Sequence, residues 1–237
     1  PRFESERGYR VRVQAVGSGM AMDLARKGNA DVLLVHEPES ERKLLDEGIG
    51  TDRRLVMHND FVLAGPPNDP AGIRGLQSIT EAFRKIAEAG SPFVSRGDAS
   101  GTDKREKTIW KKAGLDPSAA KYSETKSGMA ETLAAADGKK GYTLTDRATF
   151  LSQKHNLEIM AEGDDLLLNM YHVIRVNPGK ISGVNAEGAE RLAGFMVGSG
   201  AQQLIGDFMR EGSGRLFIPD AGKSEQDVLR GWKQVLA

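Results

Sequence analysis

The sequence predicts an α/β protein of two lobes, each a mainly parallel sheet flanked by helices, joined by a hinge of two strands. Short apolar segments alternate with helices of about ten residues, which is typical of βαβ units. Two apolar runs that end in proline, residues 59–66 and 169–178, flank a self-contained set of strands and helices. Two strands that cross between lobes are typical of proteins that close around a ligand.

The first 62 residues alternate helices with strands. Gly8 ends the first helix, and Gly17-Ser18-Gly19 turns the next strand into a helix. A chain that begins in the last turn of a helix is expected to have lost upstream sequence. In order, the expected elements are a helix end at residues 1–6, a strand at 11–16, a helix at 20–27, a buried parallel strand at 31–35 and a charged helix at 39–47.

The middle of the chain carries the self-contained set. Its expected elements are helices at 78–88, 103–113, 129–137 and 146–154 and strands at 91–94, 121–123 and 142–144. Two further helices, at 186–196 and 201–210, follow without a comparable sheet. The predicted division is residues 1–62 with 173–237 as lobe I and residues 65–170 as lobe II, with the ligand cleft between them.

Composition excludes several function classes. Lys plus Arg and Asp plus Glu both total 33, so no net field attracts nucleic acid or an anionic membrane. No apolar run approaches the roughly 20 residues of a membrane span. The chain has no cysteine, and its four histidines lack metal-ligand spacing. We therefore expect no metal, no cofactor and no catalytic residue.

The most informative loop is the segment from Ser95 to Thr102. It places Arg96 among hydroxyl and glycine residues, directly before a helix. A helix N-terminus presents unpaired N–H groups and about half a positive charge, and so favours an anion. Ser100 and Thr102 add neutral donors. The loop is suited to holding an oxyanion.

Three other strand-to-helix loops share this chemistry. They are Gly17-Ser18-Gly19, Ser127-Gly128-Met129 and the segment from Thr143 to Arg147. Ligands in α/β sheets bind where such loops gather, at the carboxyl ends of strands. Each loop can also be explained by helix capping alone, because Ser, Thr and Gly are common N-caps. Arg147 is either an anion ligand or a surface residue of its helix.

At these residues the chain resembles class II periplasmic solute-binding proteins, specifically the tungstate-binding component of an ABC-type importer. The resemblance covers nearly the whole chain. It rests on Ala15 to Gly19, Ala30 to His36, Val56 to Val62, Ser95 to Thr102, Gly141 to Arg147 and Asn169 to Pro178.

The resemblance implies a type II two-lobed fold and a periplasmic or other extracytoplasmic location. It also implies that the protein delivers tungstate, or molybdate, to a membrane permease. In the family, a tetrahedral anion is held by residues that match Arg96, Ser100, Thr102 and Ser18. Gly19, Ser127 and Thr145 complete the predicted ligand set. The family's first strand and its hydroxyl-rich loop would precede Pro1, so the resemblance implies an incomplete site in this chain.

Two alternatives remain open at this point. An enzyme on the same fold would need a titratable group, for which Asp98 and Asp146 are the candidates. Both also have an explanation as carboxylates that stabilise a helix start. A regulatory domain that senses a small ligand would carry a fused DNA-binding or signalling segment.

Overall fold

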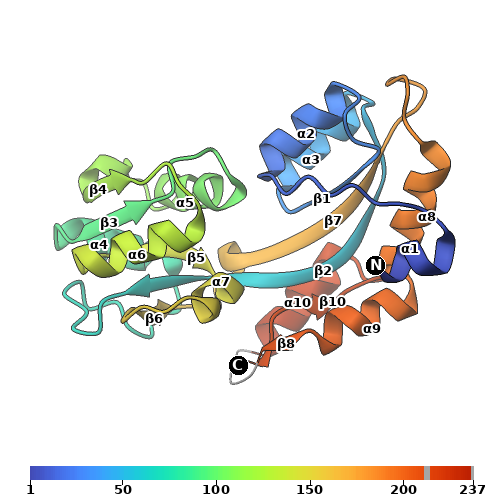
Figure 1. The fold of residues 1–237 in the computed structure, drawn as a ribbon. Coiled ribbons are helices and arrows are strands. Elements are labelled where there is room, and N and C mark those ends of the chain that lie inside the picture. Colours follow the sequence, from blue (N-terminus) through green and yellow to red (C-terminus); the bar gives the residue numbers. More distant parts are fainter. Residues whose placement is uncertain (211–213, 236–237) are drawn as a thin grey trace. The chain divides into compact units, whose positions relative to one another are not determined.

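The chain divides into two compact units, and the computed structural model describes residues 1–210 and 214–235. Unit 1 comprises Pro1–His58 and Met170–Val228, and unit 2 comprises Asn59–Asn169 and Leu229–Ala237. The chain alternates strands and helices within each unit, which confirms the α/β class (Figure 1). The predicted lobe I includes residues 211–213 and 236–237, which lie outside the described residues. Its boundaries stay a prediction.

Unit 1 surrounds its part of the sheet with helices. Two strands, β2 (Gly50–Gly65) and β7 (Leu168–Val176), run through both units and lie next to each other in the sheet. The other elements that begin in unit 1 are α1 (Arg2–Arg7), α2 (Ser18–Arg26), β1 (Val32–Val35), α3 (Pro38–Asp46), α8 (Ala186–Val197), α9 (Ser199–Asp207), β8 (Met209–Arg210), β9 (Gly214–Arg215), β10 (Ile218–Pro219) and α10 (Glu225–Val235).

Alternation along β7 builds the core of unit 1 on both faces of the sheet. Ile174 packs with Met22 of α2 and Leu44 of α3. Its neighbour Val173 packs with Ala193 of α8 on the other side. Successive residues of a strand point to opposite faces, so one strand serves two layers of helices.

The orientation of β1 corrects the expectation of a mainly parallel sheet. β1 pairs antiparallel with β7, with Val32 opposite Arg175, and β10 pairs antiparallel with β2. The near-continuous apolar run of β1 predicted a parallel strand because such strands are buried on both faces. In β1, Leu33 and Val35 are buried, whereas Leu34 on the opposite face is 44% exposed. The apolar run therefore indicated neither burial of both faces nor the direction of the strand.

The strand predicted at residues 11–16 is wrong. None of the described strands pairs with this segment, and Val13 is 80% exposed. Its contacts to the rest of unit 1 include a bond from the Gln14 side chain to the Asn29 carbonyl. Alternating apolar residues form a strand only when a neighbouring strand supplies hydrogen-bond partners.

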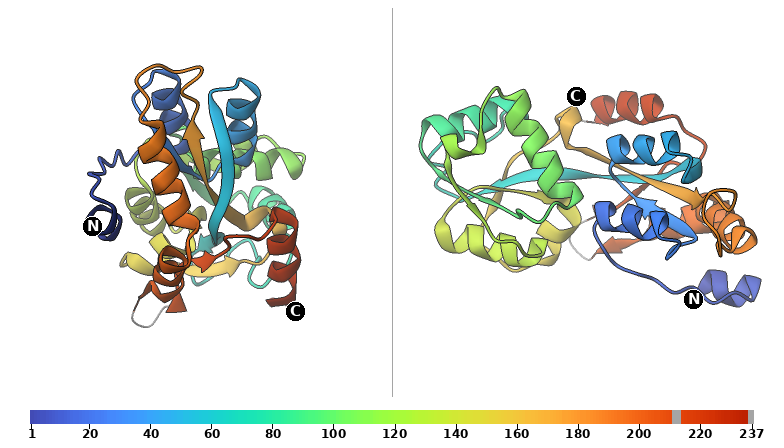
Figure 2. Two further views of the ribbon diagram at one scale, coloured as in Figure 1. Left: turned by 90° about the vertical axis from the view of Figure 1, so that its right-hand side faces the viewer. Right: turned by 90° about the horizontal axis from the view of Figure 1, so that it is seen from above.

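Unit 2 contains a layered α/β arrangement. Its elements are α4 (Ile79–Glu88), β3 (Pro92–Ser95), α5 (Gly101–Lys112), η1 (Pro117–Ala119), β4 (Lys121–Glu124), α6 (Met129–Lys139), β5 (Thr143–Asp146), α7 (Arg147–Ser152), β6 (Glu158–Ala161) and η2 (Asp165–Leu167). Phe93 of β3 packs into the cluster of α4 and α5, whereas Val94 packs into that of α6 and α7. Figure 2 shows these helix pairs on the two sides of the strands.

Strand directions within unit 2 place the predicted loops. β3 pairs parallel with β4, and its Phe93 makes a parallel bridge to Tyr142, the residue directly before β5. The carboxyl ends of these three strands therefore meet at one edge. β5 and β6 instead pair antiparallel with β2, which again corrects the mainly parallel expectation. None of the helices in residues 1–210 and 214–235 is long and apolar enough to cross a membrane.

Candidate functional site

The loop between β3 and α5 is held in shape by its own hydrogen bonds. The Gly97 amide donates to Ser95 Oγ at 3.2 Å, and the Ser100 amide donates to Asp98 Oδ1 at 3.1 Å. Gly97 and Ala99 both take left-handed φ angles, 62° and 58°. The loop is thus a compact turn that ends where α5 begins.

Arg96 lies in this loop with one donor unsatisfied. One terminal N–H group of its guanidinium pairs with Asp98. Its Nε–H is buried and has no hydrogen-bond partner among residues 1–210 and 214–235. The Arg96 carbonyl accepts the Lys126 amide at 2.7 Å, which ties the backbone beneath the side chain to the β4–α6 loop. A buried donor without a partner is costly, so an acceptor placed there would be stabilised.

Ser100 and Thr102 stand at the start of α5 and are both buried. Ser100 is the N-cap, and its Oγ accepts the Asp103 amide at 3.4 Å. Its hydroxyl hydrogen is used in a bond to the Asp98 carboxylate. The Thr102 hydroxyl makes no hydrogen bond within the described part of the chain. Thr102 can therefore donate directly to an anion at this helix start, whereas Ser100 would have to give up its bond to Asp98.

Ser127 comes from the neighbouring β4–α6 loop, and Thr145 comes from the end of β5. The loop predicted from Thr143 to Arg147 is wrong, because β5 runs to Asp146 and α7 begins at Arg147. The Ser127 hydroxyl donates to the Thr125 carbonyl at 3.2 Å, next to Gly128, the N-cap of α6, whose helix start has no side-chain cap. Thr145 is fully buried and donates to the Asp146 carbonyl at 3.1 Å. Their roles as ligand residues stay predictions.

Ser18 and Gly19 belong to unit 1, whereas the other five predicted ligand residues belong to unit 2. Ser18 is the first residue of α2 and is buried. Its Oγ accepts the His36 amide at 3.4 Å. The helix start itself has no side-chain cap, because its N-cap is Gly17.

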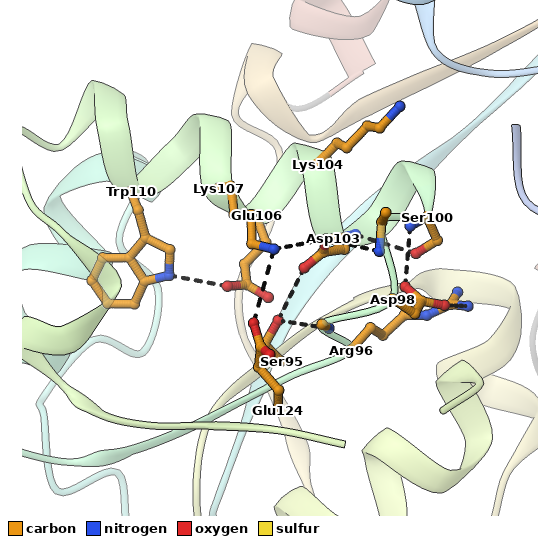
Figure 3. Close-up of polar contacts among 12 residues, drawn as sticks. Ser95, Arg96, Asp98, Ser100, Asp103, Lys104, Glu106, Lys107, Trp110 and Glu124 are labelled. Atoms are coloured by element: carbon orange, nitrogen blue, oxygen red, sulfur yellow. Dashed lines mark hydrogen bonds and ion pairs between the residues drawn. The ribbon is translucent and has the colours of Figure 1, made fainter. Parts of the chain in front are cut away.

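Two buried carboxyl groups lie directly behind the loop, and sequence reasoning missed both. Asp103 accepts the Ala99 amide at 3.1 Å and Lys107 Nζ at 2.9 Å. Glu106 is 2% exposed and accepts Trp110 Nε1 at 3.2 Å and the Tyr122 hydroxyl at 2.8 Å. Figure 3 shows these groups along α5 beside Ser95. Burial is the main cause that raises the pKa of Glu106 to about 7.

The structure resolves the open question on Arg147. Its guanidinium makes two hydrogen bonds to Asp60 of β2, one of them from Nε at 2.8 Å, and a further one to Glu162. Burial lowers its pKa, but the bonds to Asp60 and Glu162 outweigh burial and raise it. Arg147 thus ties α7 to β2 inside unit 2.

The two titratable candidates of the enzyme alternative also have structural partners. Asp146 caps α7 by accepting the Thr149 amide at 2.8 Å, as its explanation by capping predicted. Asp98 pairs with Arg96 and accepts the Ser100 amide. Its pKa lies below the usual value: burial raises it, and the bonds from Ser100 and Arg96 more than offset that.

Two histidines in unit 1 have carboxylate partners that sequence spacing did not reveal. His172 Nδ1 lies 3.0 Å from Glu41 Oε2, and its Nε2 lies 3.2 Å from Glu225 Oε1. His58 pairs with Asp220. These partners are far apart along the chain, so no motif could have predicted them. In the part of the chain that the structure describes, no group of three or more such side chains could hold a metal ion.

Comparison with known proteins places the chain in a family. Residues 1–199 match the model of the PBP superfamily domain. A candidate ABC-transporter anion-binding protein from Haloferax volcanii is 44% identical over 93% of this chain, which spans 66% of that relative's length. The tungstate-binding protein TupA of Peptoclostridium acidaminophilum is 41% identical over 94% of this chain, which spans 80% of that relative's length. The chain belongs to the TupA family.

A solved structure of the same family agrees with the fold. The tungstate-binding protein TupA from Desulfovibrio alaskensis G20 is 40% identical in sequence. The match covers 93% of this chain and 91% of the TupA chain, with a TM-score of 0.81. This relative confirms the predicted two-lobed binding-protein fold, with the strand directions corrected above. The family resemblance seen in the sequence is likewise confirmed.

Proposed function

We propose that this protein binds a tetrahedral oxyanion outside the cytoplasm and delivers it to the permease of an ABC importer. Tungstate is the proposed ligand and molybdate the second candidate. The observation that carries the proposal is the buried Arg96 Nε–H, which lies in a loop beside the start of α5 and has no partner in the part of the chain that the structure describes. The names of the TupA relatives support tungstate as the anion.

Binding in this proposal replaces the hydration of a dianion with protein donors. Leaving water is costly for an ion unless its hydrogen bonds are replaced. Arg96 supplies a charge-assisted bond, which is stronger than a neutral one. Ser100 and Thr102 supply neutral donors, and the N–H groups at the start of α5 and α6 add the favourable end of the helix dipole.

The remaining ligand residues are part of the same proposal. Ser127 lies on the β4–α6 loop and Thr145 near the end of β5, and Ser18 and Gly19 are proposed as further anion contacts contributed by unit 1. No chemical transformation is proposed, since Asp98 and Asp146 already hold structural partners. Selection among oxyanions would follow from the size of the site and from donors that a smaller anion leaves unpaired.

The proposal is tested by titrating tungstate, molybdate and sulfate into the protein and following the heat released. We expect tungstate to bind and Arg96→Ala to lose tenfold to a hundredfold or more in affinity, as removal of a charge-assisted bond of about 1.5–3 kcal/mol implies. Arg96→Lys should recover only part of the loss, because an ammonium lacks the planar fork of guanidinium.

Arg74→Ala is the matched control. Arg74 is an arginine of unit 2 that is half exposed and pairs with Glu158. Arg74→Ala changes the net charge by the same amount as Arg96→Ala. Because Arg74 is not one of the proposed ligand residues, the affinity of Arg74→Ala for tungstate should stay near that of the wild type. Equal losses in both variants would show a general charge effect, and undiminished binding by Arg96→Ala would place the anion elsewhere.

A further inference from the structure

Glu106 is a buried carboxyl group that the proposed binding of the anion does not use. It projects from α5 behind the anion loop, where Ser95, Tyr122 and Trp110 all hydrogen-bond to it (Figure 3). Ser95 also accepts the Gly97 amide and contacts Asp103 Oδ1 at 3.4 Å. Ser95 therefore connects the loop to both buried carboxyl groups.

A count of hydrogen atoms favours one protonation state of this cluster. Ser95 has a single hydroxyl hydrogen, but Asp103 and Glu106 both lie within its reach. If both carboxyls are ionised, they compete for that hydrogen. If Glu106 is protonated, it can donate to Ser95 Oγ while Ser95 donates to Asp103. An ionised Glu106 would still accept from Trp110 and Tyr122, but the second arrangement also removes the competition for the Ser95 hydrogen and the repulsion from Asp103.

Charged groups from several elements surround Glu106. Asp103 and Lys107 lie with it on α5, and Lys107 also faces Glu124 at the end of β4. The loop itself contributes the Arg96 and Asp98 pair.

Besides Glu124 of β4, and Arg84 of α4 whose Nε donates to the Ala113 carbonyl at the end of α5, the other elements pack uncharged groups against this helix. β4 contributes Tyr122, α4 places Phe83 against Trp110, and β5 adds Leu144 to the same apolar cluster. Arg96 and Lys107 are already paired with carboxylates. An ionised Glu106 would add a negative charge behind a site for a dianion, and Lys107, whose pKa it helps to raise, already pairs with Asp103.

We propose that Glu106 is a positioning residue that couples anion binding at the Ser95–Thr102 loop to the uptake of one proton. The proton is taken from solvent by the Glu106 carboxylate, and the neutral carboxyl then orients Ser95 and with it the loop. This inference rests on the proposed function, because it concerns the same anion site.

The direction of the pH effect follows from linkage. Because the pKa of Glu106 lies at about 7, the group is half protonated at neutral pH in the free protein. A bound dianion raises that pKa further, so the complex holds the proton more firmly. Affinity is therefore constant well below pH 7 and falls as pH rises through and above it, by at most tenfold per pH unit.

The test is calorimetric titration with sodium tungstate at pH 7 in two buffers of different ionisation enthalpy. The dependence of the measured heat on the buffer gives the number of protons taken up. We expect about 0.5 proton for the wild type, because half the free molecules already carry it. Glu106→Gln, which keeps an acceptor and gains a donor, should take up none and bind with constant affinity from about pH 6.5 to 8.5.

Two further variants keep the test decisive. Glu88→Gln removes an exposed carboxylate on α4 and should behave as the wild type does. Tyr122→Phe removes a donor that stabilises the ionised form of Glu106, so the fall in affinity should move to higher pH. This variant tests the coupling even if Glu106→Gln does not fold.

The outcomes separate the two proposals. If the wild type binds tungstate and Arg96→Ala does not, but no proton is taken up and affinity does not change with pH, the coupling is overturned and the proposed function stands. The same holds if Glu106→Gln shows the pH dependence of the wild type. If tungstate does not bind at any pH, the proposed function fails and the coupling falls with it.

Discussion

Ser100 can cap a helix and still contact an anion if it exchanges one bond. Its hydroxyl accepts the Asp103 amide with a lone pair and donates its hydrogen to Asp98, so an anion would replace Asp98 and leave the cap intact. Thr102 lies two residues further along, and its hydroxyl makes no comparable bond to the residues that the structure describes. The two hydroxyls therefore contribute differently to stability although they are proposed to contribute alike to binding.

This difference gives a prediction for two single-residue changes. Ser100→Ala should lower the free energy of unfolding by about 1 kcal/mol, because it removes the N-cap of α5. Thr102→Val should change it by less than about 0.5 kcal/mol, since no bond within the protein is lost. Both should weaken tungstate binding. Urea unfolding without the anion measures the first quantity and calorimetric titration the second.

Each of the two measurements can contradict its part of this prediction independently of the other. Unchanged stability in Ser100→Ala would mean that its bond to the Asp103 amide contributes nothing. A stable Thr102→Val variant that binds as tightly as the wild type would remove Thr102 from the proposed ligand set.

At the scale of elements, the loop between β3 and α5 depends on the packing of Gly97. This residue has a φ of 62°, and a Cβ atom there would lie 2.5 Å from the Cβ of Glu124. Contact this close does not occur between real Cβ atoms, so β4 or the loop must shift. Gly90 has a similar φ of 57°, but a Cβ would meet nothing within 4 Å.

We therefore predict a larger effect for Gly97→Ala than for Gly90→Ala. In both variants alanine must adopt a left-handed φ angle, which lowers the free energy of unfolding by about 1 kcal/mol or more. Gly97→Ala adds the collision with Glu124 and should also weaken anion binding, whereas Gly90→Ala should leave binding unchanged. Chemical unfolding and titration of the two variants measure this. Equal losses of stability in the two variants would show that the loop or β4 shifts away from the contact at little cost in free energy.

Helices and strands were predictable where local signals and burial agree. Helix α5 begins at its hydroxyl cap, and α1 ends at Gly8, as glycine and capping chemistry indicate. The strand at residues 11–16 and the direction of β1 were not predictable, because pairing is decided by which distant segment lies alongside. β6 was missed for the same reason: its partner is β2.

The position of the proposed anion loop followed from the sequence, but the groups behind it did not. Arg96, Ser100 and Thr102 stand together in ten residues of chain. Asp103 and Glu106 were treated as part of a charged run, although they share a helical face with Trp110, at spacings of three and four residues. That spacing was the available signal. Its meaning depends on Tyr122, which β4 brings from elsewhere in the chain.

For the whole molecule, Glu106 predicts how stability changes with pH. Its pKa is about 7 in the folded protein and near 4.5 in the unfolded chain, so the folded state binds more protons between these values. Stability from this group is fully present below about pH 4.5 and is lost as pH rises to 7, by about 3 kcal/mol in all. Glu106→Gln should lack this loss.

The measurement is the free energy of unfolding in urea at about pH 5 and pH 8, without anion. Subtracting the values for Glu106→Gln from those of the wild type removes the contributions of other titrating groups. A difference that does not change with pH would mean that Glu106 titrates near its ordinary value in the folded protein. The proton coupling proposed above would then lose its basis.

The bond from the Trp110 indole to Glu106 gives the molecule a built-in optical reporter. Indole emission depends on the charge and hydrogen bonding around the ring, and here the acceptor is the group whose protonation is proposed to change. The chain has only one other tryptophan, Trp232. With that residue replaced by phenylalanine, the fluorescence of an unlabelled protein would follow the proton behind the anion loop in real time, including how fast it arrives after the anion does.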